Sequence, residues 1–260
     1  MRTYTSDAAI LTVVEQPHAK GVLVTTGGWA YCQQVRALAR RSGLTLLCGR
    51  FAKDGYVGPG LRERRHLDWG NPDYLRTLAR EAAALHGRVA GQLVLVGVSY
   101  SGFGVATLAS HHPELRPDRL IVIDSYLDLA ARRVAAGTGA IGREIDSETG
   151  GSAAALARRS VRVDGLAALV TAGTRLQVIW SVAPDEAREF KGATCNLSAN
   201  AAALQQLANA LDRPVPGWVT RNRHGHDLWD HGREILRGTL PGRQVIFRPG
   251  GSVPGWAVCP

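Results

Sequence analysis

One serine stands at a point in the chain where its hydroxyl could act as a nucleophile. The apolar run Leu93–Val98 leads directly into Ser99, and small residues lie two positions before it and two positions after it, Gly97 and Ser101. Gly102–Leu108 then has the composition of the first turns of a helix. A strand that turns sharply into a helix pushes the side chain at the turn outward, and the crowded backbone there requires small neighbours. The pattern predicts a nucleophile elbow at Ser99, with the start of the helix directed at the site.

A serine needs a base to take its proton, and two histidines late in the chain could serve. His224 and His226 follow an expected strand and precede an expected helix. We favour His226, because Gly225 before it gives the loop room to present the ring, and His224 is the alternative. His231 is expected to lie inside the helix.

A histidine base is oriented by a carboxylate, and the chain offers two aspartates in the order serine, acid, histidine. Asp124 directly follows the strand expected after the elbow helix, and a right-handed strand–helix–strand connection places that strand end beside Ser99. Asp185 follows the next strand and is the alternative. Asp124 also has a purely structural interpretation as the cap of a following helix, and Asp128 is a candidate lid residue.

Acyl chemistry also requires two N–H donors for the oxyanion that forms on the substrate. The first donor should be the backbone of Tyr100, directly after the nucleophile. The second should come from the loop Thr25–Trp29, where glycines allow close approach to the substrate oxygen and Gly28 or Trp29 would donate. The same loop could instead be a simple turn before a helix. It is not a phosphate loop, because no Gly-Lys-Ser/Thr follows.

The segments that must position these residues alternate between apolar strands and amphipathic helices. This alternation is typical of an α/β fold with a mostly parallel, twisted sheet and helices on both faces. Strands are expected at Ala9–Val14 (the first, at an edge), Gly21–Thr25, Leu44–Cys48, Leu93–Val96, Leu120–Ile123, Leu176–Trp180 and Gly217–Thr220 (the last). Helices are expected at Gln33–Arg41, Asp73–Leu85 (capped by Asn71, with Pro72 first), Ala199–Ala210 and Asp227–Leu236.

One long interval breaks this alternation. Residues 127–174 separate two strands by far more than a minimal crossover and hold helical pieces joined by glycine-rich segments. An insertion over the strand ends would act as a helical lid. We expect one α/β domain over residues 1–260 with this insertion, since no linker-like composition separates two cores.

The chain of 260 residues carries a formal charge of +9, almost all of it from arginine. Such a charge fits either a solvated basic surface or an acidic partner. Nucleic acid is not expected, because basic and aromatic residues do not interleave. A membrane is not expected either, because no apolar run approaches the ~18 residues of a membrane span. The N-terminal residues lack the shape of a signal peptide, which makes a cytoplasmic location the expectation.

The four cysteines, Cys32, Cys48, Cys195 and Cys259, are scattered and lack metal-site spacing. They are interpreted as reduced thiols, and neither a metal nor a cofactor is expected.

The serine, acid and histidine patterns together resemble the α/β-hydrolase superfamily from about Ala9 to Leu236. Two positions depart from that family. Ser101 stands where glycine is usual, and Thr26-Gly27 stands where the family's oxyanion loop has His-Gly.

Within the superfamily, the chain looks most like thioesterases of polyketide and nonribosomal-peptide assembly lines. The segment Leu120–Tyr126, with Asp124 after the apolar run, carries this resemblance. The resemblance implies that Asp124 is the acid and that a helical lid follows. It also implies release of an acyl chain, by hydrolysis or macrocyclisation, from a thioester on an acidic acyl or peptidyl carrier protein.

These patterns lead to three hypotheses for the function. The first is serine-dependent acyl transfer from a carrier-bound thioester. The second is a small-molecule esterase or lactonase that needs no carrier, and the third is a non-catalytic scaffold for binding or assembly. Stand-alone cyclases that close a ring by carbon–carbon bond formation are also similar, but they use cysteine at the elbow, so Ser99 makes that reaction less favoured.

Overall fold

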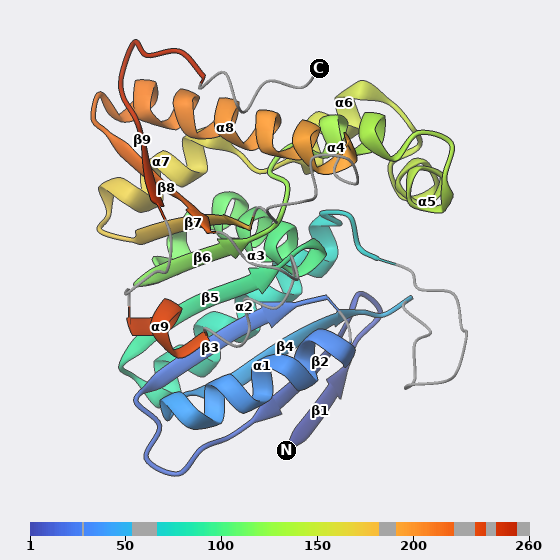
Figure 1. The fold of residues 1–260 in the computed structure, drawn as a ribbon. Helices are drawn as coiled ribbons and strands as arrows, with labels where there is room; N and C mark the ends of the chain where they lie inside the picture. The colour runs from blue at the N-terminus through green and yellow to red at the C-terminus, as the bar shows by residue number, and fades with distance from the viewer. Residues whose placement is uncertain (28, 54–66, 182–190, 221–231, 238–242, 254–260) are drawn as a thin grey trace.

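The fold is built on one nine-stranded, mostly parallel sheet in the order β1-β2-β4-β3-β5-β6-β7-β8-β9 (Figure 1). The computed structural model describes the chain except residues 28, 54–66, 182–190, 221–231, 238–242 and 254–260. The strands are β1 (Arg2–Thr5), β2 (Ala9–Val14), β3 (Gly21–Thr26), β4 (Thr45–Phe51), β5 (Gln92–Val98), β6 (Arg119–Ile123), β7 (Arg175–Ser181), β8 (Val215–Thr220) and β9 (Arg243–Phe247). The six central strands are parallel, whereas β1, β2 and β9 pair antiparallel. The expected α/β class, with a mostly parallel sheet and helices, is confirmed.

The burial of each strand follows from what covers the sheet. Every residue of β3 is buried, as expected for a strand with helices on both faces. In β2 buried and half-buried residues alternate, because one of its faces is more open. Helices α2 (Pro72–Val89), α3 (Tyr100–His111), α7 (Val163–Thr171) and α8 (Lys191–Leu211) pack on one face, and α1 (Trp29–Ser42) and α9 (Gly232–Arg237) on the other.

The cap expected for α2 is present. The Asn71 side chain accepts hydrogen bonds from the backbone N–H groups of Asp73 and Tyr74, at 3.0 and 3.2 Å, and Pro72 is the first helical residue.

Both ends of the sheet differ from the expectation. Ala9–Val14 is not the edge strand, because β1 lies outside it with every residue exposed. Gly217–Thr220 is not the last strand, because β9 pairs antiparallel with β8. Neither edge strand has a strong burial pattern, and without that pattern the sequence has no signal to show.

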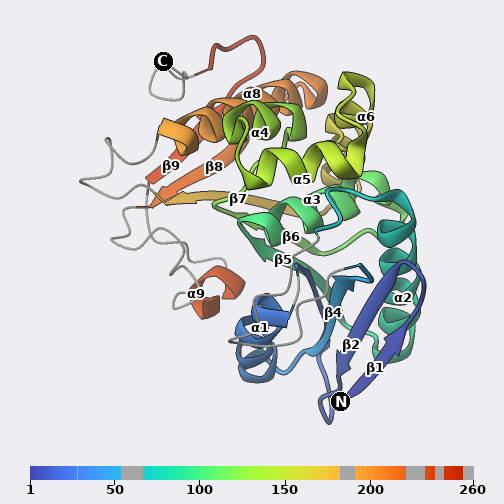
Figure 2. The ribbon, with the colours of Figure 1, turned by 90° about the vertical axis from the view of Figure 1, so that its right-hand side faces the viewer.

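Four helices lie between β6 and β7, in the interval where a lid was expected. They are α4 (Leu129–Ala136), α5 (Ala140–Thr149), α6 (Ala153–Arg159) and α7. Helix α7 belongs to the layer on the sheet, since Leu166 and Leu169 join the main core. Helices α4–α6, called the inserted helices below, stand beyond that layer (Figure 2).

The interpretation of the cysteines is wrong for two of them. Cys32 in α1 and Cys48 in β4 form a disulfide, with Cα atoms 5.7 Å apart. Disulfides are typical of oxidising compartments, so the cysteines no longer support a cytoplasmic location. Among the helices in the described ranges, none combines the length and hydropathy needed to cross a membrane.

Candidate active site

Ser99 occupies a sharp turn between β5 and α3. Its backbone has φ 55° and ψ −124°, a conformation that residues with a Cβ rarely adopt. Its N–H donates to the Ile123 carbonyl at 2.8 Å, and its carbonyl accepts from the Phe103 N–H at 3.1 Å. The residue thus ends the parallel ladder and starts the helix. Strain of this kind is typical of functional sites and presents the half-buried Ser99 side chain at the strand end.

The small residues around the serine are a steric requirement. A Cβ on Gly97 would lie 2.2 Å from the Ser101 carbonyl oxygen, and one on Gly102 would lie 2.6 Å from the Ser125 Cβ. Neither distance is possible without movement of the backbone. The turn therefore needs glycine two residues before the nucleophile, as the sequence pattern predicts.

Ser101, where the superfamily usually has glycine, is fully buried and takes part in the packing. Its hydroxyl and that of Thr25 are 2.9 Å apart and share a hydrogen bond. The Thr26 hydroxyl donates to the Ser101 carbonyl at 3.4 Å. The departure from the family pattern thus fastens the end of β3 to the elbow.

The expected oxyanion donors follow the neighbouring strands β3 and β5 in the sequence. Tyr100 is the first residue of α3, so its N–H has no partner within that helix. Gly27 has φ 105°, which favours glycine, and its N–H donates to the Gly49 carbonyl at 3.2 Å. Gly28 lies outside the described residues, and Trp29 begins α1. The structure therefore brings the Tyr100 donor and the loop after β3 to the same edge of the sheet.

Asp124 follows β6 at the same edge. Val98 pairs with Ile123 in the register of β5 and β6, so Ser99 and Asp124 are the next residues of adjacent strands. The Asp124 N–H donates to the Ile179 carbonyl at 2.9 Å, and its φ of 44° marks a sharp end to the strand. The carboxylate is half-buried.

The helix-capping role considered for Asp124 is filled by Asp128 instead. Asp128 is the cap of α4, and its Oδ1 accepts from the N–H groups of Ala130 and Ala131 at 2.8 and 3.1 Å. Asp124 therefore does not cap this helix. Asp185, His224 and His226 lie outside the described residues. The parallel strands β7 and β8 that precede them end at the same edge as β5 and β6.

Asn200 is a site residue that sequence reasoning missed. It lies in α8, is fully buried, and holds the loop that follows Asp124. Its Nδ2 donates to the Ser125 carbonyl at 2.5 Å, and its Oδ1 accepts from the Leu127 N–H at 2.7 Å. The sequence offered no distinctive signal, because the helix Ala199–Ala210 also contains Gln205, Gln206 and Asn209. Asn200 fixes the path of the chain just beyond the candidate acid.

A second missed residue, Asp68, lies against Tyr100. Its carboxylate accepts a hydrogen bond from the Tyr100 hydroxyl, and the carboxylate is buried. Burial raises the pKa of Asp68 to about 7, although backbone N–H groups, including that of Gly70, and the charge of Arg159 lower it. Carboxyls with a strongly shifted pKa are typical of functional sites, and this one contacts the residue directly after Ser99.

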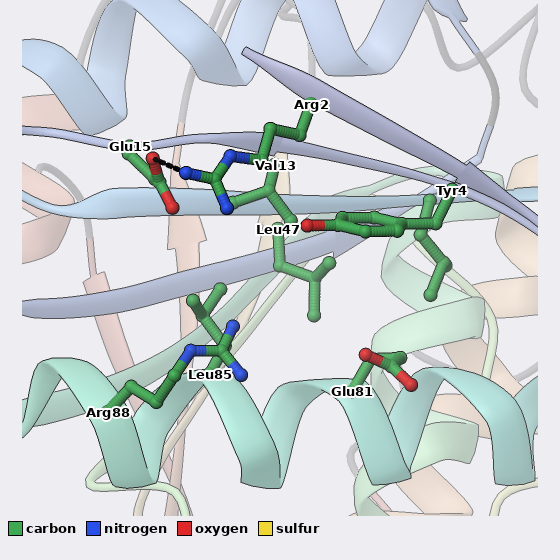
Figure 3. Close-up of a pocket in the computed structure, with 9 residues that line it drawn as sticks. Arg2, Tyr4, Val13, Glu15, Leu47, Glu81, Leu85 and Arg88 are labelled. Carbon is green, nitrogen blue, oxygen red and sulfur yellow. Dashed lines mark ion pairs between the residues drawn. The ribbon is translucent and has the colours of Figure 1, made fainter.

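A cavity of ≈ 290 Å³ lies elsewhere, between the β1 edge of the sheet and α2. Figure 3 shows Glu81, Leu85 and Arg88 of α2 facing Tyr4 and Val13 across it. None of its lining residues belongs to β3, β5 or β6, so it is remote from Ser99. Its Arg2 is already paired with Glu15 at 3.7 Å. The cavity is not part of the candidate active site.

Comparison with known proteins supports the fold at low sequence identity. No family model and no curated protein matches the sequence. The structure of the capsule O-acetyltransferase of Neisseria meningitidis serogroup A is similar, with a TM-score of 0.58 and 11% identity over 91% of this chain and 92% of that chain. An acetyl xylan esterase from Paenibacillus sp. R4 has a TM-score of 0.51 and 15% identity over 89% of this chain and 78% of that chain. The chain thus shares its fold with an acyltransferase and an esterase.

Proposed function

We propose that the protein transfers or hydrolyses acyl groups through a covalent acyl-Ser99 intermediate. The observation that carries this proposal is the strained backbone of Ser99 between β5 and α3, with φ 55°. That geometry costs free energy and presents a hydroxyl rather than packing it into the core. Asp124 on the adjacent strand and the Tyr100 N–H at the start of α3 support the same chemistry.

The proposed reaction has two steps. His226, with His224 as the alternative, takes the Ser99 proton while Oγ attacks the acyl carbonyl. Asp124 holds the imidazole in the right tautomer and stabilises its cation, with Asp185 as the alternative acid. The N–H groups of Tyr100 and of Gly28 or Trp29 bind the oxyanion, and the alcohol or thiol leaves with a proton from the imidazolium. Water or an acceptor hydroxyl or amine then attacks acyl-Ser99.

The first substrates to test are short-chain acyl esters. The two fold neighbours carry the names of an O-acetyltransferase and an acetyl esterase, and both names concern the acetyl group. The fold alone does not assign their substrates to this chain. Chromogenic acetyl and butyryl esters are therefore a direct first assay, with and without a sugar acceptor, because an acceptor raises turnover only if transfer competes with hydrolysis.

A carrier-bound thioester in natural-product biosynthesis remains the finer form of the proposal, with an acidic carrier protein as partner. Two arginines between β6 and β7 form ion pairs within the protein, Arg133 with Asp146 and Arg162 with Asp164, each at 2.5 Å. They are thus less available to a partner. The test compares one acyl chain on a carrier and on a small thiol. A carrier preference that weakens with salt supports this form, and equal turnover of both substrates contradicts it.

Covalent labelling tests the proposal as a whole. A fluorophosphonate should add one mass adduct to the wild-type protein and none to Ser99→Ala. Ser110→Ala is the matched control, since Ser110 is a buried serine of the same helix, α3, and should not affect labelling. An adduct on folded Ser99→Ala would assign the nucleophile elsewhere. A folded wild-type protein that takes no label would favour the non-catalytic scaffold.

A further inference from the structure

A tight turn lies next to the elbow helix and has no place in the proposed triad. The Asn71 N–H donates to the Asp68 carbonyl at 2.9 Å and closes a β-turn. Its two central residues, Trp69 and Gly70, have φ of 43° and 73°. Positive φ at both positions defines a turn with little conformational freedom, and it brings the Gly70 N–H against the Asp68 carboxyl.

Two hydrogen bonds join the turn to Tyr100, the first residue of α3, and a third within the turn orients the Asp68 carboxyl. The Tyr100 hydroxyl donates to Asp68 Oδ1, and the Asp68 N–H donates to the Tyr100 hydroxyl oxygen at 2.8 Å. The Gly70 N–H donates to Asp68 Oδ2 at 2.9 Å and orients the carboxyl. Both side chains are buried. Because Tyr100 directly follows Ser99, this network fixes the start of the helix that supplies an oxyanion donor.

The same turn is bound to the inserted helices. Glu144 of α5 accepts from the Leu67 N–H at 2.6 Å and from the Trp69 indole N–H at 3.1 Å. Arg159 of α6 donates to the Asp68 carbonyl at 3.4 Å, and a Cβ on Gly70 would lie 2.6 Å from the Arg159 carbonyl oxygen. The turn therefore contacts α3, α5 and α6 at once.

Aromatic rings extend this connection. The Trp69 ring lies 5.3 Å from that of Tyr100, edge to face, and 6.3 Å from that of Tyr126, stacked. Phe103 of α3 stacks on Tyr126 at 5.0 Å. These rings form one buried cluster with Leu129, Ile145 and Leu156 of the inserted helices. A shift of the inserted helices would therefore displace the rings that pack against Tyr100 at the start of α3.

We propose that Asp68 is a positioning residue of the acyl-transfer site, which holds the Tyr100 backbone N–H in place for the oxyanion and links it to the inserted helices. This inference rests on the proposed function. Asp68 touches neither the substrate nor Ser99 in this mechanism. It acts through the side chain of Tyr100.

A buried carboxyl at this position makes the site sensitive to pH. The ionisable groups that face the turn within the described residues are Tyr100 of α3, Glu144 of α5 and Arg159 of α6. Ionised Asp68 places a negative charge about one aromatic side chain away from the forming oxyanion. Like charges at roughly 10 Å and an effective dielectric constant of about 20 change a rate by on the order of tenfold. Reactivity therefore falls as Asp68 ionises, near neutral pH.

The experiment measures the second-order rate at which a neutral fluorophosphonate labels Ser99, as a function of pH. The variants are Asp68→Asn, which cannot ionise, and Tyr100→Phe, which keeps the ring and removes the hydroxyl. Tyr74→Phe is the matched control, because Tyr74 is an equally buried tyrosine in α2, away from the elbow. Circular dichroism and thermal melting report whether each variant is folded.

In the wild type the rate should rise as the histidine base becomes neutral and then fall about tenfold above neutral pH. Asp68→Asn should lose the fall and keep the rise. Tyr100→Phe should label about tenfold more slowly at every pH, and Tyr74→Phe should match the wild type. A purely structural role would change melting temperature and leave the pH profile of folded protein unchanged.

Several outcomes would overturn the inference. A wild-type rate that does not fall above neutral pH contradicts it even if no variant folds. Folded Asp68→Asn and Tyr100→Phe proteins with the wild-type rate and profile also contradict it. Failure of the proposed function looks different, since Ser99 of the wild type would then take no label at any pH.

Discussion

The buried carboxyl of Asp68 should make the stability of the protein fall as pH rises. In the unfolded chain an aspartate has a pKa of ~3.9, and in the folded protein burial raises the pKa of Asp68 to about 7. Between these values the folded state keeps a proton that the unfolded state has lost. The free energy of unfolding therefore decreases with pH in this window and levels off above it. This direction is opposite to that of an aspartate whose pKa is depressed by a salt bridge.

The size of the effect follows from the pKa difference. About three units at ~1.4 kcal/mol each give on the order of 4 kcal/mol between pH ~4 and ~8. Asp68 is 1% exposed, so solvent does not screen the effect as it would at the surface. Asp68 is the first residue of the turn that continues through Trp69 and Gly70. Asparagine has the same shape, and its single amide oxygen accepts one of the two hydrogen bonds that Tyr100 and Gly70 donate to the carboxyl.

Urea unfolding of the wild type and of Asp68→Asn at several pH values measures this contribution. Other carboxyls and histidines titrate equally in both proteins, so the difference between the two stabilities isolates Asp68. Wild-type stability minus variant stability should fall by about 4 kcal/mol across the window. A difference that stays constant with pH would show that the carboxyl ionises as in the unfolded chain, and the burial argument would be wrong.

Four further substitutions test the site and its support. Asp124→Asn should lower kcat by about 10⁴-fold if Asp124 orients the base. Asp128→Ala should cost about 1 kcal/mol of stability, because the cap of α4 is lost, and should leave kcat unchanged. Ester turnover and thermal melting separate the two effects. Equal kcat losses would contradict the assignment of roles. Gly97→Ala places a Cβ 2.2 Å from the Ser101 carbonyl oxygen. The variant should be destabilised by about 3 kcal/mol, and Ser99 should no longer be labelled. A fully labelled variant would show that the elbow backbone can shift to accept the methyl group. The disulfide between Cys32 and Cys48 closes a loop with a sequence separation of 16. Its reduction should lower the free energy of unfolding, measured in urea, by about 3 kcal/mol. Cys32→Ser should show the same loss of stability without reductant.

The elbow could be predicted because its signal is local. An apolar strand, a serine and small residues two positions away determine the turn, and the clash that a Cβ on Gly97 would make shows why. The neighbouring ends of β5 and β6 at one edge followed in the same way, from alternating elements and the handedness of crossovers. Asp124 could be placed at that edge, but the sequence could not decide whether Asp124 or Asp128 caps the next helix, since both types of position favour aspartate.

What the sequence could not reveal depends on contacts between distant segments. Asp68 meets Tyr100 across 32 positions, and Asn200 meets Ser125 across 75. Nothing in either local pattern names the partner. The disulfide was missed for a related reason. The cysteines look scattered, but a strand–helix–strand unit brings the first turn of α1 beside β4.

The positive charge of the chain has a partly structural explanation that bears on its partners. Arg133 and Arg162 are paired with aspartates, and Arg159 donates to the turn that holds Tyr100. Arg40 and Arg41 lie in the last turn of α1, where cations are favoured by the helix dipole. These arginines are used by the fold itself, so a net charge of +9 is not by itself a sign of an acidic carrier protein. A free ester substrate explains the described site without a docking partner. Salt decides between the two forms of the proposal: turnover of the carrier-bound substrate weakens with salt if an acidic carrier binds by charge, and salt-insensitive turnover would leave the free ester as the substrate.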